Sequence, residues 1–264
     1  MNILDKIIAH KRQEVDARKE KFPVKLLEDS IYFNTPTVSL SAYLQRPDKH
    51  GIIAEFKRKS PSKNFMKYKP NLESIVSGYE IAGACGISIL TDFNFFGGSQ
   101  IDLIKSRNIF DGPILRKDFI LDEYQIIESK SLGADVILLI ASILSKEKIN
   151  AFAKLAKELN LEVLAEIHNE NELDKVLIPH VDMIGVNNRN LRLFQTNIDT
   201  SKTIASKIPE DFLKLSESGI ENYESVIQLR KYGYKGFLIG GYFMGSKDPA
   251  KLATQIIKDI KDEN

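Results

Sequence analysis

Charged and amide side chains stand at the carboxyl ends of several short apolar segments. These residues are Glu55, Lys57, Lys117, Glu166, Asn187, Arg189 and Glu217. Lysine can donate a proton to an oxygen and glutamate can remove one, so the set contains the groups that acid–base catalysis needs. A single charged residue at the end of a strand is more often simply exposed to solvent than catalytic. Gathered at one place, these residues would shift one another's pKa values, as acid–base sites require.

The elements that must position these residues alternate from residue 51 onward. The expected strands are residues 52–57, 87–91, 114–117, 136–140, 163–167, 183–187, 213–217 and 237–239. Most are continuous apolar runs, which is typical of parallel strands buried on both faces. Between them, apolar residues such as Leu72, Ile75, Val76 and Tyr79 recur at helical spacing. Eight strand–helix units predict an α/β fold, a closed (β/α)8 TIM barrel with its chemistry at the carboxyl ends of the strands.

The first 50 residues depart from this alternation. Ile3–Lys21 predicts a charged amphipathic helix, and Leu40–Leu44 predicts a second, short one. A segment of this size would struggle to bury a core of its own. We therefore expect one domain over residues 1–264, with residues 1–50 as an N-terminal helical extension packed on the barrel of residues 51–264. Because the chain ends soon after the eighth helix, we expect it to be monofunctional.

Two regions suit the binding of a phosphate group. The loop after the first strand carries six cationic residues between positions 57 and 69, together with Ser60 in a Ser-Pro-Ser run at 60–62. A charge run alone is usually a solvated loop, but hydroxyls beside positive charge suit phosphate. The last two strands end in Ser218 and Gly219 and in Gly240 and Gly241. Glycine lets backbone N–H groups approach an anion, and these loops are the usual phosphate site of the fold. We predict a phosphorylated, anionic small-molecule substrate.

The composition argues against several other classes of protein. A net charge of +1 gives no electrostatic reason to expect nucleic acid or an anionic membrane as partner. The apolar stretches are far shorter than the roughly 20 residues of a membrane-spanning helix, and the N-terminus does not resemble a secretory signal. Cys85 is the single cysteine and is expected to pack as a small hydrophobe in a reducing, cytoplasmic setting. The four histidines are scattered, so no metal site is expected.

Short motifs stand in order along the chain from about residue 50 to the last strand. They are residues 53–57 (IAEFK), 60–62 (SPS), 90–92 (LTD), 95–99 (FFGGS), 114–119 (ILRKDF), 133–135 (GAD), 138–140 (LLI), 164–168 (LAEIH), 184–191 (IGVNNRNL) and 217–220 (ESGI). Together they resemble the indole-3-glycerol-phosphate synthase family of tryptophan biosynthesis. The KDF motif of the third strand combined with the NNR motif of the sixth makes the resemblance specific, and the helical N-terminus also suits the family.

The resemblance implies a carboxy-lyase that works without a cofactor. The family converts 1-(2-carboxyphenylamino)-1-deoxyribulose 5-phosphate to indole-3-glycerol phosphate, with release of carbon dioxide and water. By resemblance, Lys117 is the general acid of ring closure and Glu166 the general base of the later dehydration. Lys57 would contact the substrate carboxylate and share in proton transfer, while Glu55 and Asn187 would orient the reacting groups. Which of the two lysines donates at which step stays open.

The resemblance also implies substrate-binding roles. Arg189 would face the substrate carboxylate, and Glu217 would bind the sugar hydroxyls. Phe96 and Phe119 would flank the anthranilate ring. The phosphate would be held by Ser60, Ser218, Gly219, Gly240 and Gly241. No obligate protein partner is evident.

Two departures from the family pattern and three rival functions remain. Asn64 stands where the family often has glycine, and residues 241–244 differ from the usual stretch after the last strand. A phosphoribosylanthranilate isomerase would need a cysteine or aspartate base where this chain has Glu55 and Lys57, and Cys85 precedes its strand. A Schiff-base aldolase would use Lys117 as nucleophile. A phosphate-binding barrel without activity would not need the acid–base set.

Overall fold

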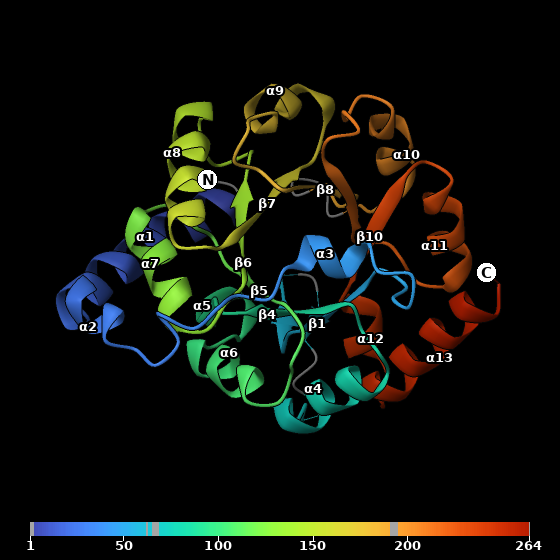
Figure 1. Ribbon diagram of the computed structural model, residues 1–264, viewed down its shortest axis with the longest axis horizontal. Helices are drawn as coiled ribbons and strands as arrows, with labels where there is room; N and C mark the ends of the chain where they lie inside the picture. Colours follow the sequence, from blue (N-terminus) through green and yellow to red (C-terminus); the bar gives the residue numbers. More distant parts are fainter. Residues whose placement is uncertain (1–2, 62, 65–68, 191–194, 264) are drawn as a thin grey trace.

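The computed structural model describes residues 3–61, 63–64, 69–190 and 195–263, with only the backbone for 63–64. Eight parallel strands close into a barrel in the order β1-β10-β9-β8-β7-β6-β5-β4, and helices surround them (Figure 1). The strands are β1 (Ile52–Phe56), β4 (Gly86–Leu90), β5 (Ile114–Lys117), β6 (Val136–Ile140), β7 (Glu162–Ile167), β8 (Met183–Asn187), β9 (Leu213–Glu217) and β10 (Tyr234–Ile239). The predicted (β/α)8 barrel is confirmed.

A helix follows every barrel strand. These outer helices are α4 (Leu72–Ile81), α6 (Gln100–Arg107), α7 (Glu123–Ser131), α8 (Lys146–Glu158), α9 (Leu173–Val176), α10 (Asp199–Ala205), α11 (Tyr223–Arg230) and α13 (Pro249–Asp262). Most begin at a side chain that accepts a backbone N–H, as Asp122 does from Tyr124 at the start of α7. Within the described ranges, none of the helices is long and apolar enough to cross a membrane.

Each strand separates two layers of the core. Alternate side chains, such as Ile53, Leu115 and Leu164, fill the barrel interior. The intervening ones, such as Phe56, pack against the apolar faces of the outer helices. This alternation confirms that Phe56 points toward the helices, so that Glu55 faces inward. Polar side chains at inward positions therefore gather at the carboxyl end of the barrel.

The N-terminal residues form α1 (Ile3–Lys21), α2 (Val24–Glu28) and α3 (Leu40–Leu44). The helix α3 closes the amino end of the barrel, because its Leu40 and Leu44 join the apolar cluster of the interior (Figure 1). Both α1 and α2 contact α7 on the outside. The apolar start of α1 reaches the opposite, carboxyl end of the barrel, where Ile3 and Ile7 line a pocket. The two helices predicted in this region are confirmed with their bounds, and α2 was not predicted.

Short additional elements stand in the loops at the carboxyl end. They are the antiparallel pair β2 (Lys59–Ser60) and β3 (Lys63–Asn64), the helices α5 (Phe93–Phe96) and α12 (Gly241–Gly245), and the 3-10 helix η2 (Glu170–Glu172). The predicted strands 52–57 and 87–91 end one residue earlier than expected, at Phe56 and Leu90. The last residues of the two predicted strands, Lys57 and Thr91, therefore belong to the loops at the carboxyl end of the barrel.

Candidate active site

A pocket opens at the carboxyl end of the barrel. Every residue predicted for the site lines it: Glu55, Lys57, Ser60, Phe96, Lys117, Phe119, Glu166, Asn187, Arg189, Glu217, Ser218, Gly219, Gly240 and Gly241. Ser62, Lys67 and Leu191, which belong to the predicted loop and motifs, lie outside the described residues. The parallel strands bring these residues together from positions far apart in the sequence, because all of their carboxyl ends meet at one rim.

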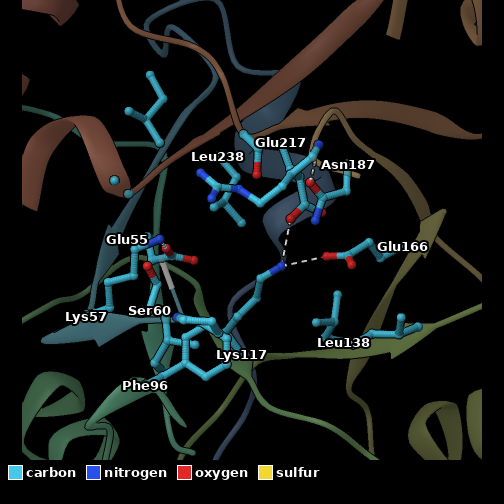
Figure 2. A pocket seen from close by; sticks show the side chains of 18 of the residues that line it. Glu55, Lys57, Ser60, Phe96, Lys117, Leu138, Glu166, Asn187, Glu217 and Leu238 are labelled. Atoms are coloured by element: carbon cyan, nitrogen blue, oxygen red, sulfur yellow. Dashed lines mark hydrogen bonds and ion pairs between the residues drawn. The ribbon is translucent and has the colours of Figure 1, made fainter. Parts of the chain in front are cut away.

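Lys117 stands at the centre of the pocket and bridges two glutamates (Figure 2). Its Nζ lies 2.7 Å from Oε2 of Glu166 and 2.7 Å from Oε2 of Glu217. The three side chains come from β5, β7 and β9, and their exposed fractions are 13%, 4% and 2%. Asn187 on β8 pairs in register with Glu217. One ammonium group thus holds two buried carboxylates.

The charges around Lys117 shift the pKa of each group. Burial disfavours the ammonium form of Lys117, but the charges of Glu166 and Glu217 outweigh burial and raise its pKa above the usual value. Burial would raise the pKa of Glu166, but Lys117 and His168 outweigh it and lower that pKa. Burial raises the pKa of Glu217 to about 7, and Lys117 only partly opposes it. The site therefore holds a protonated lysine beside one ionised carboxylate and one carboxyl group that keeps its proton more readily.

A second ion pair lies on the other side of the pocket (Figure 2). The Nζ of Lys57 lies 2.5 Å from Oε1 of Glu55, and both side chains are largely buried. On β8, Oδ1 of Asn187 accepts the backbone N–H of Arg189 at 3.0 Å. That contact holds the chain as it leaves the strand toward the pocket rim. The two lysines thus line one pocket, Lys57 from the loop after β1 and Lys117 from the end of β5.

Two glycines make room for the buried carboxylates, a role that the sequence analysis missed. A Cβ on Gly240 would lie 2.1 Å from Oε1 of Glu55, and a Cβ on Gly185 would lie 2.4 Å from Oε1 of Glu217. Neither position tolerates a side chain unless the glutamate moves. A Cβ on Gly241 would meet nothing within 4 Å. Gly240 thus has a structural reason to be glycine that is separate from any contact with phosphate.

The loop after β9 turns sharply beside the pocket. Ser218 and Gly219 both have left-handed backbone conformations, with φ of 68° and 75°. Such a turn aims successive N–H groups to one side and can form a concave anion site. Across the pocket, the rings of Phe96 and Phe119 lie 6.0 Å apart at 40°. The pocket therefore combines aromatic surface with backbone that suits an anion.

Two cations of the loop after β1, Arg58 and Lys59, do not line the pocket. Arg58 pairs with Asp102 at 2.9 Å and donates to the carbonyl oxygen of Gly97, outside the pocket. Lys59 donates to the carbonyl oxygen of Asn94 at 2.5 Å. The physical reason is that successive side chains leave the loop in different directions, and these two tie it to α5 and α6. Among the described cations of this loop, Lys57 is the one that lines the pocket.

Charged residues behind the pocket were also missed. Lys11 of α1 is fully buried, and its Nζ lies 3.0 Å from both Asp92 and Asp118, at the carboxyl ends of β4 and β5. Burial opposes the charge of Lys11, but Asp118 and Asp92 outweigh it and raise its pKa. A signal was present in the sequence, because Lys11 interrupts the apolar stripe of Ile7 and Val15 at four-residue spacing.

His168 was not predicted as a site residue. Cys85 was predicted to pack as a small hydrophobe. His168 follows β7, and its Nε2 lies 3.4 Å from Oε1 of Glu166. Cys85 lies at the amino end of β4 in the interior cluster, and burial raises its thiol pKa to about 12. In the part of the chain that the structure describes, no group of three or more His, Cys, Asp or Glu side chains could hold a metal ion.

Comparison with known proteins identifies relatives of this chain. The family model of indole-3-glycerol phosphate synthase matches residues 4–256. The chain belongs to the indole-3-glycerol phosphate synthase family. A relative of that name from Bacteroides thetaiotaomicron is 46% identical over 260 residues, which cover 98% of this chain and 99% of the relative. Another, from Caldanaerobacter subterraneus, is 41% identical over 92% of this chain and 93% of its own length. The resemblance seen in the motifs is confirmed.

Solved structures support the same fold at lower sequence similarity. A thiamine phosphate pyrophosphorylase from Pyrococcus furiosus matches with a TM-score of 0.59 and 18% identity, over 85% of this chain and 98% of its own. A mutant tryptophan synthase alpha-subunit from the same organism matches with a TM-score of 0.59 and 13% identity, over 81% and 98%. At such identities these likenesses concern the barrel alone. Membership of the family rests on the sequence matches.

Proposed function

We propose that this chain converts 1-(2-carboxyphenylamino)-1-deoxyribulose 5-phosphate to indole-3-glycerol phosphate in tryptophan biosynthesis, in the cytoplasm. The observation that carries the proposal is the buried bridge from Lys117 to Glu166 and Glu217 in the pocket of a family member. It offers a proton donor and a proton acceptor within one hydrogen-bonded group. Ring closure with loss of carbon dioxide, followed by loss of water, needs both kinds of group.

Lys117 acts in this proposal as the general acid and Glu166 as the general base. Its raised pKa keeps Lys117 protonated until an oxygen of the substrate takes the proton. The lowered pKa of Glu166 keeps that carboxylate ready to accept a proton during dehydration. Lys57 tethers the substrate carboxylate with Arg189 and shares in proton transfer. A Schiff-base aldolase is less well supported, because its nucleophilic lysine must lose its proton, which the carboxylates around Lys117 oppose.

The remaining pocket residues bind and orient the substrate. Glu55 and Asn187 orient the reacting groups, and Glu217 binds the sugar hydroxyls. Phe96 and Phe119, whose ring centroids lie 6.0 Å apart, flank the anthranilate ring. The phosphate is held by Ser60, Ser218, Gly219, Gly240 and Gly241. Phosphate binding, remote from the reacting carbon atoms, supplies binding energy that orients them.

The test is direct turnover by the purified protein. The carboxyphenylamino-deoxyribulose phosphate is added in the presence of a metal chelator, and formation of the fluorescent indole product is followed. We expect turnover without added metal. Absence of product while the substrate still binds, measured by calorimetry, would overturn the proposal. Trapping of a substrate adduct on Lys117 with borohydride would favour the aldolase instead.

A further inference from the structure

Glu166 and Glu217 contact Lys117 at the same distance, yet their other oxygens differ. In Glu166, Oε1 lies 3.4 Å from Nε2 of His168, a charge contact in which Nε2 makes no hydrogen bond to a described residue. In Glu217, Oε1 is buried with no hydrogen-bond partner among the described residues. A single lysine cannot neutralise two buried carboxylates, so one of them retains a proton more readily than the other. The imidazole beside Glu166 favours ionisation of Glu166 over Glu217.

The position of His168 is itself fixed by a third glutamate. Oε2 of Glu172 accepts the backbone N–H of His168 at 2.7 Å and lies 3.7 Å from its Nδ1. The His168 side chain is 10% exposed. Burial disfavours the imidazolium, but Glu172 and Glu166 outweigh it and raise the pKa of His168. The imidazole therefore lies beside two carboxylates that favour its charged form, and His168 is not among the described residues that line the pocket.

We propose that His168 is a positioning residue that makes Glu166, and not Glu217, the carboxylate that is free of a proton when substrate arrives. With His168 charged, two cations face Glu166 and one faces Glu217. The proton that the pair retains then resides on Glu217. The consequence for catalysis rests on the proposed function, in which Glu166 is the general base, but the distribution of the proton does not.

Two other groups around the carboxylates act in the same direction, but neither brings a positive charge to Glu166 as His168 does. Lys117 of β5 contacts both equally, whereas the uncharged Asn187 of β8 hydrogen-bonds Glu166 and helps to lower its pKa. On β1, Glu55 is paired with Lys57 at 2.5 Å, and its negative charge still helps to raise the pKa of Glu217. On η2, Glu172 is negative and would itself repel a second carboxylate. It therefore favours ionisation of Glu166 only through its contact with His168. His168 thus adds a second positive group within 4 Å of Glu166, whereas the two carboxylates share Lys117.

Carboxyl titration tests this without any substrate. The protein is labelled with glutamate carrying ¹³C at the side-chain carboxyl, and the signals of Glu166 and Glu217 are assigned with Glu166→Gln and Glu217→Gln. We expect Glu217 to titrate near pH 7 and Glu166 well below it. In His168→Asn, the midpoint of Glu166 rises by about one pH unit or more, the usual effect of removing a neighbouring cation. His180→Asn, the same change outside the pocket, is the matched control and leaves both midpoints in place.

A second variant and a kinetic measurement complete the test. Glu172→Gln keeps the imidazole but weakens its charge, so the midpoint of Glu166 rises by less and in the same direction. If circular dichroism shows that His168→Asn does not fold, the Glu166 midpoint in Glu172→Gln tests the inference instead. In turnover, the acidic limb of kcat/KM moves to higher pH in both variants. An unchanged Glu166 midpoint in a folded variant overturns the inference, even if the wild type is active. A shifted midpoint without turnover by the wild type overturns only the proposed function.

Discussion

The ammonium nitrogen of Lys117 lies 2.7 Å from a carboxylate oxygen of Glu166, 49 positions further along the chain. The two side chains project from β5 and β7, and the contact is almost closed to solvent. At this depth each charge stabilises the other and neither is screened strongly by water. The same contact that lowers the pKa of Glu166 raises that of Lys117, so the pair is poised in opposite protonation states for one reaction.

Replacement of Lys117 should affect turnover more than binding. We expect Lys117→Ala to lower kcat by about 10²-fold or more, the usual contribution of a general acid, with a much smaller change in KM. Steady-state kinetics with the indole product as readout measures both. Lys154→Ala, a surface lysine on α8 with a 66% exposed side chain, is the control and should behave as wild type. An unchanged kcat in Lys117→Ala removes this residue from the chemistry.

The raised pKa of Glu217 predicts a pH-dependent loss of stability. Its folded-state pKa of about 7 exceeds the ordinary value of 4.5, mainly because the carboxyl group is buried. The folded state therefore binds the proton more tightly, and the favourable contribution present below pH 4.5 is lost as pH rises through about 7. Glu217→Gln removes this loss. Its Tm relative to wild type should increase by about 2 °C or more between pH 5 and pH 8.

Glu158→Gln provides the comparison for that measurement. Glu158 lies on α8 with a 60% exposed side chain, so the same substitution there should give a Tm difference that does not change with pH. Equal pH profiles for Glu217→Gln and Glu158→Gln would contradict the assignment of a raised pKa to Glu217.

The two adjacent glycines after β10 should respond differently to alanine. In Gly240→Ala the new methyl group displaces the carboxylate of Glu55, and we expect a loss of about 1–3 kcal/mol in the free energy of unfolding. In Gly241→Ala the methyl group meets no atom of the protein within 4 Å, so the stability of the free protein should not fall. Urea denaturation measures both. A similar loss in the two variants would show that the Glu55 contact is not the cause.

Removal of the Lys11 charge should destabilise the protein strongly. Lys11→Met leaves Asp92 buried without the cation that α1 supplies, whereas Asp118 keeps Arg116 at 3.1 Å. Breaking a buried ion pair in this way costs about 3–5 kcal/mol. Chemical denaturation measures the loss, and Lys6→Met, an exposed position on the same helix, serves as control. Equal stability of the two variants would mean that the buried carboxylates find another partner.

Much of the barrel follows from local sequence. The strands 114–117, 136–140, 183–187 and 213–217 have the predicted bounds, because apolar runs between turn signals allow few other positions. The buried faces of α4 and α8 follow from helical spacing for the same reason. The pair β2 and β3 was missed, because two-residue strands in a polar loop carry no periodic pattern.

Site residues could be predicted from the sequence where a polar residue stands at the end of an apolar strand. Lys117, Glu166, Asn187 and Glu217 are polar residues that end apolar strands, and period-two alternation turns them inward. Arg58 and Lys59 could not be separated from Lys57 in this way, since a loop has no period that fixes the direction of a side chain. Their roles in tying the loop to α5 and α6 depend on atoms that lie 35 to 44 residues away in the chain.

By itself the sequence determined the type of fold, the family and the residues that meet at the barrel mouth, because these depend on patterns read along the chain. Tertiary structure alone decided how the charges are shared. Lys117 lies between Glu166 and Glu217, His168 stands behind only one of them, and Gly240 yields its space to Glu55. Such relationships depend on closure of the barrel and on burial, which bring distant charges within a few ångströms and out of water, where small differences in distance set the pKa values.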